Sequence, residues 1–228
     1  MSKLLTVKIL IKSRFPRAAA AFRNAREALF RRSLTDIFTE IYHTNEWQDS
    51  ESVSGRGSTL GRTGVIMAQL PTLAKELRIE TLLDAACGDF NWMRHTTLND
   101  LKYIGVDVVP DLIKRNQELY ASDRQTFVVA DITRSPLPHA DAILCRDCLI
   151  HLSFRSIDAA ISNFKKARAR YLLCTTHSSV TANVDIPDGS WRSVNLQLPP
   201  FNFPEPMKVV VEDAELGKIL GVWRLEDL

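Results

Sequence analysis

Five short, almost entirely apolar segments follow one another from residue 80 onward, and this pattern constrains the fold more than any other feature. Runs of this length without polar interruption are typical of strands buried on both faces, as in a parallel sheet. Helical patterns lie between some of them, at Pro110–Tyr120 and Phe154–Ala169. Alternating strands and helices predict right-handed βαβ units and a doubly wound sheet. The five segments are Glu80–Ala86, Tyr103–Val108, Thr126–Ala130, Ala142–Cys145 and Tyr171–Thr175.

Two further apolar segments near the C-terminus extend the predicted sheet. Met207–Val211 and Leu220–Leu225 are close enough along the chain to form antiparallel edge strands. They follow Leu198–Pro206, whose prolines exclude a helix. Upstream, Ser33–Tyr42 and Thr63–Leu77 have helical patterns. We therefore predict an α/β fold with a doubly wound, mostly parallel, seven-stranded sheet and an N-terminal helical cap.

The first 32 residues are strongly basic, with nine Lys and Arg against a single acid, Glu27. Three interpretations of this segment stay open: an amphipathic segment on anionic lipid, an organelle transit peptide, or a solvated helix. Basic residues interrupt each apolar stretch, which excludes a secretory signal peptide. A chain of 228 residues suits one α/β domain. We therefore predict a separate segment at residues 1–32 and one domain at 33–228, with its cap at 33–78.

The four cysteines lie in or beside apolar runs, where a free thiol behaves as a small hydrophobic group. This usage predicts a reducing, cytoplasmic location, at the inner face of the membrane if the basic segment binds lipid. Cys145 and Cys148 form a CxxC pair, but no second pair stands at zinc-ligand spacing, so no metal is predicted.

Acidic residues stand at the ends of three successive predicted strands, at Asp84, Asp107 and Asp131. Asp107 follows Gly88 by nineteen residues, and an acid about 20 residues past a glycine turn holds ribose hydroxyls in this kind of fold. A lone acid at a strand end is more often a cap or a turn residue. Recurrence at three strand ends favours a ligand site at one edge of the sheet.

The turn after the first strand argues against a dinucleotide ligand. A pyrophosphate-binding turn needs three glycines, and here Phe90 takes the place of the second. The neighbouring Asp89 would repel a diphosphate. An acidic turn favours a cationic ligand, such as one that carries an ammonium and a sulfonium.

At these positions the sequence resembles the class I S-adenosylmethionine (SAM)-dependent methyltransferases, over residues 38–228. Leu83–Gly88 is similar to the first motif of that family, and Asp107, Asp131 and Cys145–Leu152 fall where its later motifs fall. Phe90 departs from the broader family pattern. The resemblance is closest to a subgroup whose marks are matched by Asn45–Trp47, Ser52–Ser58, Cys87–Met93 and Arg146–Ser153. It implies a Rossmann-like fold with SAM as cofactor and S-adenosylhomocysteine as product.

The resemblance also implies which residues hold the cofactor. Asp84, Ala86 and Gly88 would contact the methionine end, and Asp107 the ribose diol. Asp131 and Ile132 would contact the adenine. The loop at Gly55–Ser58 would close over the cofactor. The remaining implied contacts come from Trp47, Ser58, Val108 and Arg146.

Methyl transfer to an alcohol also needs a base that removes the hydroxyl proton. His151, just past the fourth predicted strand, is our candidate, with Asp147 orienting it or serving instead. The competing interpretation of His151 is a partly buried histidine that starts a helix. Carboxylates could bind a divalent metal, but nothing in the spacing of the acidic residues requires one.

The predicted substrate segment is Asn183–Phe201, because it combines polar and aromatic residues that are unusual between strands. A ring there could stack on a sugar, and an arginine could pair with a phosphate or carboxylate. The competing interpretation is a structural crossover loop. The predicted substrate residues are Asp185, Trp191, Arg192 and Asn195.

We therefore expect a methyltransferase that acts on a hydroxyl of a small molecule, such as a sugar or a glycolipid or polysaccharide intermediate. The alternatives are a nitrogen, protein or RNA acceptor, or a cofactor-binding paralogue without catalysis. A nucleic-acid partner is not expected, because residues 33–228 carry a net charge of −6. Peripheral membrane contact would come from residues 1–32.

Overall fold

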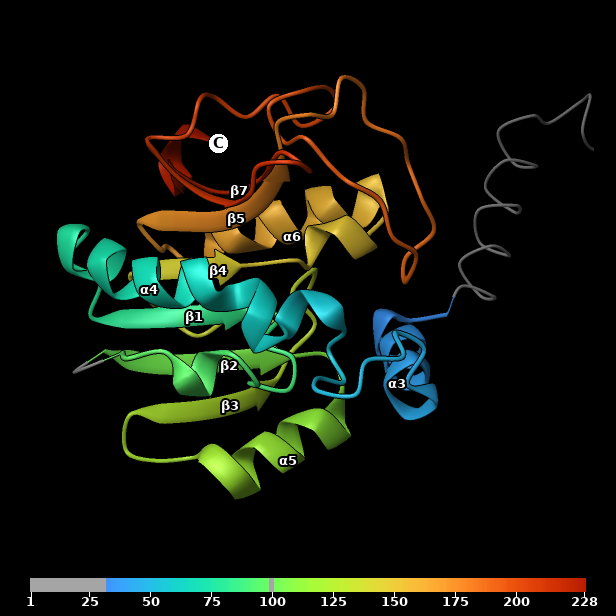
Figure 1. Ribbon diagram of the computed structural model, residues 1–228, viewed down its shortest axis with the longest axis vertical. Coiled ribbons are helices and arrows are strands. Elements are labelled where there is room, and N and C mark those ends of the chain that lie inside the picture. The colour runs from blue at the N-terminus through green and yellow to red at the C-terminus, as the bar shows by residue number, and fades with distance from the viewer. Residues whose placement is uncertain (1–31, 99–100) are drawn as a thin grey trace, which may run out of the picture. The chain divides into compact units, whose positions relative to one another are not determined.

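The structure is a computed structural model that describes residues 32–98 and 101–228. Its centre is a seven-stranded sheet with the order β3-β2-β1-β4-β5-β7-β6 (Figure 1). Neighbours from β3 to β5 pair in parallel, whereas β7 is antiparallel to both β5 and β6. The predicted Rossmann-like sheet is confirmed. The strands are β1 (Thr81–Ala85), β2 (Lys102–Asp107), β3 (Gln125–Val129), β4 (Ala142–Cys145), β5 (Tyr171–His177), β6 (Lys208–Asp213) and β7 (Lys218–Arg224).

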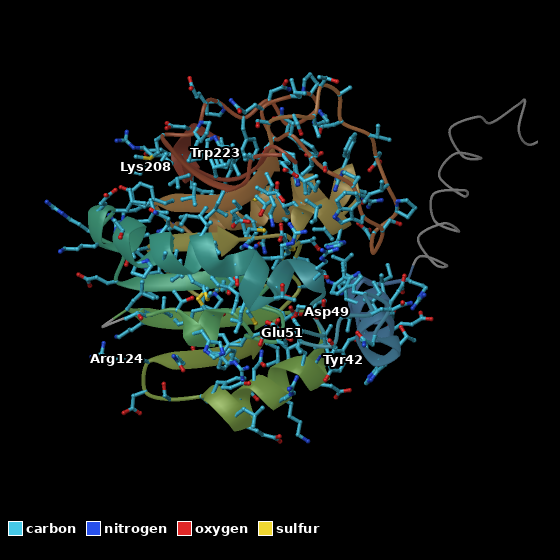
Figure 2. All side chains as sticks on the ribbon, in the orientation of Figure 1. Tyr42, Asp49, Glu51, Arg124, Lys208 and Trp223 are labelled. Carbon is cyan, nitrogen blue, oxygen red and sulfur yellow. The ribbon has the colours of Figure 1, made fainter. Side chains whose placement is uncertain are left out.

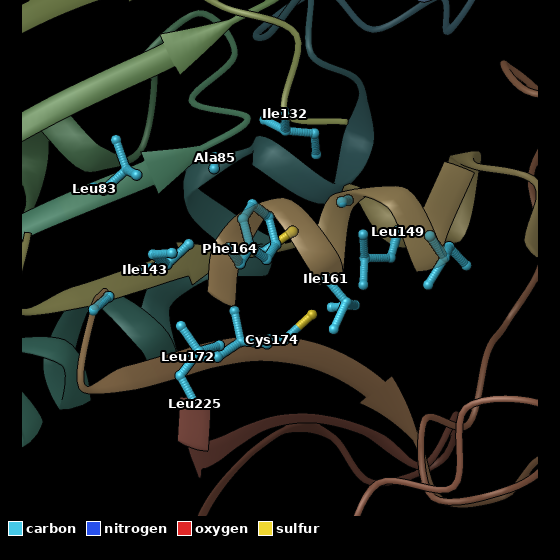
Figure 3. Close-up of a cluster of buried hydrophobic side chains, with 14 of the residues drawn as sticks. Leu83, Ala85, Ile132, Ile143, Leu149, Ile161, Phe164, Leu172, Cys174 and Leu225 are labelled. Carbon is cyan, nitrogen blue, oxygen red and sulfur yellow. The ribbon is translucent and has the colours of Figure 1, made fainter. Parts of the chain in front are cut away.

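The two main hydrophobic clusters lie on opposite faces of this sheet, because successive strand residues point to opposite sides. On one face, Leu82 packs with Ile66 and Leu70 of the helix α4 (Leu60–Glu76). Leu83 packs with Phe164 of α6 on the other face (Figure 3). The α-helices are α3 (Leu34–Thr44), α4 (Leu60–Glu76), α5 (Pro110–Tyr120) and α6 (Phe154–Lys166).

Local sequence signals explain where two of these helices begin. Pro110 occupies the first turn of α5, where its missing N–H group costs no hydrogen bond. Ser153 caps α6, and its hydroxyl accepts a hydrogen bond from Ser156 N. Short 3-10 turns supplement the helices: η1 (Arg56–Ser58), η2 (Met93–His95), η3 (Leu149–His151) and η4 (Leu225–Asp227).

The expectation that each strand is buried on both faces was wrong for β3. Phe127 faces the core, whereas Val128 and Val129 are 41% and 49% exposed. The reason is that β3 is an edge strand of the sheet. The helix alternation is also incomplete: residues 130–141, between β3 and β4, form turns, and the described residues between β1 and β2 form only η2.

Leu34–Leu228 form one compact unit. Within it α4 belongs to the layer that covers the sheet, and α3 lies at the end where the strands β1 and β2 terminate (Figure 1). Figure 2 places Tyr42, Asp49 and Glu51 at that same end. The predicted lipid contact of residues 1–32 falls on residues 1–31, outside the described part, and stays a prediction. None of the helices among the described residues is long and apolar enough to cross a membrane.

Candidate active site

A cavity of about 470 Å³ opens at the carboxyl ends of β1, β2 and β4. The strand order reverses between β1 and β4, and such a reversal point is where open α/β sheets bind ligands. The volume lies within the ordinary range for cofactor and small-molecule sites. Thirteen predicted site residues line it: Trp47, Ser58, Asp84, Ala86, Gly88, Asp107, Val108, Asp131, Ile132, Arg146, Asp147, His151 and Trp191.

Asp89 fastens the loop before α4 to the turn after β1. Its carboxylate accepts hydrogen bonds from Ser52 Oγ at 2.9 Å, Val53 N at 3.0 Å and Ser54 Oγ at 3.2 Å. Asp89 is not among the residues that line the cavity. The acid at this position therefore holds the loop, and its carboxylate does not itself line the cavity.

Two glycines allow this loop to approach the strand ends. Gly88 has a φ of +56°, and a Cβ there would overlap Ser54 Oγ. A Cβ at Gly57 would lie 2.9 Å from Asp147 Oδ2. Any larger residue at either position would displace the loop from the cavity that it borders.

Asp107 lies at the end of β2 with a buried carboxylate that faces the cavity. Its two oxygens accept hydrogen bonds from Gly88 N and Val109 N, each at 3.1 Å. Burial raises the pKa of Asp107, and these backbone donors oppose the rise. Two carboxylate oxygens offer about four acceptor sites, so acceptor capacity remains for a ligand hydroxyl.

Asp84 lies at the cavity end of β1 and binds the hydroxyl of Tyr103 at 2.7 Å. Burial raises the pKa of Asp84 to about 7, against the lowering effect of Tyr103 and Arg146. The carboxyl group is therefore poised to ionise near neutrality, and a cationic ligand group beside it would favour the charged form.

Asp131, after β3, shapes its own turn. Thr133 donates through its backbone N and its hydroxyl, at 2.9 and 2.6 Å, and Arg134 pairs with the other carboxylate oxygen at 2.9 Å. The neighbouring Ile132 is buried and lines the cavity. Its apolar side chain provides a surface for a flat ring.

Four charged side chains form a buried cluster at the cavity wall, defined here as the charge cluster: Arg146, Asp147, Glu212 and Lys218. Arg146 makes a two-bond contact with Glu212, at 2.8 and 3.1 Å. Lys218 pairs with Glu212 at 3.0 Å and with Asp147 at 2.5 Å. Arg146 also donates to Gly57 O at 2.9 Å. The cluster thus ties β4, the β6–β7 hairpin and the loop at η1 together.

The charge cluster keeps Asp147 ionised. Burial alone would raise its pKa, but the adjacent cations of Arg146 and Lys218 hold the pKa below its ordinary value. Glu212 and Lys218 were not predicted as site residues. They stand in a hairpin more than 60 residues after Arg146, and no motif links them to it.

His151 lies in the cavity wall with its ring orientation fixed. Its Nδ1 is 3.0 Å from the carbonyl oxygen of Ser190, and its ring lies 5.1 Å from that of Trp47. Because a carbonyl only accepts, Nδ1 carries the proton and Nε2 keeps a lone pair. Burial lowers the pKa of His151, so the ring is neutral at pH 7.

Three of the four predicted substrate residues serve the fold instead of the cavity. Asp185 accepts from Phe154 N at 2.7 Å, at the start of α6. Arg192 donates to the carbonyls of Leu149 and Leu152, and Asn195 donates to Val180 O. Their polar character satisfies backbone groups of an irregular connection. Trp191 lines the cavity and is 62% exposed.

The family comparison identifies residues 82–170 as a methyltransferase domain. A solved magnesium protoporphyrin IX methyltransferase of Synechocystis, with bound SAM, is 14% identical with a TM-score of 0.58. The match covers 86% of this chain and 99% of that one. A comparison with curated proteins finds no match to the sequence.

A 1,6-didemethyltoxoflavin-N1-methyltransferase of Burkholderia thailandensis, solved with its substrate and S-adenosylhomocysteine, is 15% identical with a TM-score of 0.57. That match covers 84% of this chain and 86% of the other. Both structures show the same fold at low identity. Residues 82–170 thus match a methyltransferase domain, and the chain has the fold of these two methyltransferases.

Proposed function

We propose that the protein transfers the methyl group of SAM to a hydroxyl oxygen of a small molecule, such as a sugar or a glycolipid or polysaccharide intermediate. The observation that carries the proposal is the state of His151. Its Nδ1–H is held by Ser190 O and its pKa is lowered by burial, so Nε2 is available as a base at the cavity wall. Transfer to an alcohol requires such a base, whereas transfer to a neutral amine does not.

The residues at the strand ends fit the cofactor. Asp107 would accept from the ribose hydroxyls, and Gly88 lets the backbone approach the ligand. Asp84, with Ala86, would face the methionine end, where an ammonium group favours the carboxylate form. The adenine would lie beside Val108, Ile132 and Asp131.

The loop at η1 would cover the cofactor through Ser58, while Trp47 lies on the face of His151. Arg146 acts at a distance from the ligand in this proposal, because its donors are directed to Glu212, Asp147 and Gly57. It holds the loop in place. A fixed loop excludes water and orients the reactants.

Bound SAM would supply a methyl group already activated by its sulfonium, and would leave as S-adenosylhomocysteine once its C–S bond breaks. As the new C–O bond forms, Nε2 of His151 takes the hydroxyl proton, and the imidazolium that results is stabilised by the nearby charge of Asp147. Ser190 O keeps the ring in place throughout. The aromatic side chains of Phe38, Tyr42 and Trp191 at the cavity would contact the apolar parts of the acceptor.

The test is transfer of labelled methyl from SAM to a panel of nucleotide sugars and glycan acceptors. Mass spectrometry would then decide whether the product is an ether. His151→Gln should lower kcat roughly 10²–10⁴-fold, the usual contribution of a general base. Binding of S-adenosylhomocysteine should be unchanged.

The matched control is His139→Gln, since His139 is exposed and lies outside the cavity lining. It should retain full activity. Transfer only to amines, proteins or RNA would contradict the proposal. Transfer to an amine would favour a nitrogen acceptor, as the name of the Burkholderia enzyme gives for that protein.

A further inference from the structure

Two buried polar atoms in the cavity wall have no hydrogen-bond partner among the described residues: Asp147 Oδ1 and His177 Nδ1. Leaving such an atom unpaired costs roughly 1–3 kcal/mol. Native proteins therefore pair nearly all of them, and an exception in a residue that lines a cavity points to a contact with a ligand.

Adjacent strands bring these two residues together. Cys145 of β4 pairs with Cys174 of β5, so Asp147 and His177 extend from neighbouring strands at the same edge. Thr175 Oγ1 accepts from Asp147 N at 2.9 Å, and His177 N donates to Val194 O at 2.8 Å. Both backbones are therefore fixed at this end of the strands.

The two atoms together have the hydrogen-bonding character that a hydroxyl group matches. Asp147 is ionised, so Oδ1 only accepts, while burial lowers the pKa of His177 and keeps its ring neutral. When the proton of the neutral His177 ring lies on Nδ1, one hydroxyl can donate to Asp147 Oδ1 and accept from His177 Nδ1–H. A phosphate or carboxylate would be repelled by Asp147, and an ammonium cannot accept.

We propose that Asp147 and His177 form a recognition site for a second hydroxyl of the acceptor, next to the one that is methylated, so that the protein selects vicinal diols such as those of a sugar ring. This inference rests on the proposed function. His151, His177 and Asp147 all line the same cavity, so the base and the recognition site border one binding space.

Asp147 holds this second hydroxyl without deprotonating it. Lys218 at 2.5 Å and Arg146 at 3.2 Å stabilise its charge. A carboxylate so stabilised is a weak base. The division of roles is therefore proton removal by His151 and diol recognition by Asp147 with His177.

The experiment measures the binding of 4-nitrophenyl pyranosides of gluco, galacto and manno configuration by calorimetry, at saturating S-adenosylhomocysteine. Each probe is compared with its monodeoxy counterparts. At least one diol should bind the wild-type protein. Removal of one hydroxyl should weaken that binding roughly tenfold, the value of one hydrogen bond.

His177→Leu should weaken binding of the intact diol by the same factor and leave binding of the deoxy probe unchanged. His177→Asn, which keeps a polar atom near the position of Nδ1, should restore much of it. His177→Leu should also raise the Tm of the free protein, because it removes an unpaired buried group.

The control is Thr39→Val, since Thr39 Oγ1 is likewise buried without a partner in the described part of the chain but lies outside the cavity lining. It should change Tm without changing probe binding. The proposal is overturned if no diol binds, if His177→Leu binds diol and deoxy probes as the wild type does, or if it lowers the Tm.

Labelled SAM in parallel samples separates this inference from the proposed function. Diol binding that depends on His177 but yields no methyl ether would overturn the function and leave the recognition site. Ether formation with wild-type selectivity in His177→Leu would overturn the recognition site and leave the function.

Discussion

Replacing Arg146 by Met would test whether the charge cluster holds the cavity together. The change removes one of two cations and leaves Glu212 and Asp147 to share Lys218. It also removes the donor to Gly57 O. The side chains of Arg146 and Glu212 are only 3% and 2% exposed, so the change leaves a largely desolvated carboxylate without its arginine partner.

Breaking a buried pair by removing one partner costs about 3–5 kcal/mol. For a chain of this size, each kcal/mol lowers Tm by roughly 2–4 °C. We therefore expect Arg146→Met to lower Tm by roughly 6–20 °C. Urea unfolding should show the same loss of free energy. Calorimetry should show weaker binding of S-adenosylhomocysteine, because the loop at Gly57 loses its anchor.

The matched control is Lys208→Met. Lys208 pairs with Glu76 at 2.8 Å, but both side chains are well exposed, and such pairs contribute about 0–1 kcal/mol. Adding Glu212→Leu to Arg146→Met should recover part of the stability, because it removes the unpaired charge. A loss for Arg146→Met no larger than that for Lys208→Met would refute the argument.

Three further outcomes are expected. Asp107→Ala should abolish binding of S-adenosylhomocysteine in calorimetry, with NADH binding neither form; undiminished binding would contradict the ribose assignment. Gly88→Ala should lower Tm and cofactor affinity, because its methyl group would overlap Ser54 Oγ, whereas Gly61→Ala, with open space in α4, should raise stability by up to about 1 kcal/mol. Burial raises the pKa of Asp84 from 3.8 to about 7, so stability should fall as pH rises between these values. Asp84→Asn should make the free energy of unfolding, measured with urea, less dependent on pH in this range. An unchanged dependence on pH would contradict the role of Asp84.

The strand ends could be predicted from the sequence because their signal is local. Asp84, Asp107 and Asp131 each follow an apolar run, and parallel strands bring such residues to one edge. The bounds of α5 and β4 were predicted correctly for the same reason. Whether a strand lies at the edge of the sheet depends on distant parts of the chain, so the exposed face of β3 was not predicted.

The long-range part of the site could not be predicted in this way. Glu212, Lys218 and His177 carry no motif, and their relation to Arg146 and Asp147 arises from the pairing of β7 with β5. Asp89 shows the opposite difficulty. The sequence shows an acidic residue in the turn, but only the structure shows that Ser52 and Ser54 donate hydrogen bonds to its carboxylate.

The long sequence separation within the charge cluster has a consequence for how the protein is made. Gly57 and Glu212 stand 89 and 66 residues from Arg146, on either side of it in the chain. During synthesis, β1 to β5 leave the ribosome before the β6–β7 hairpin does. Until that hairpin docks, Arg146 lacks Glu212, and Asp147 lacks Lys218. The nascent chain therefore completes its cavity last, and premature termination within the final two strands would leave a sheet without a working site.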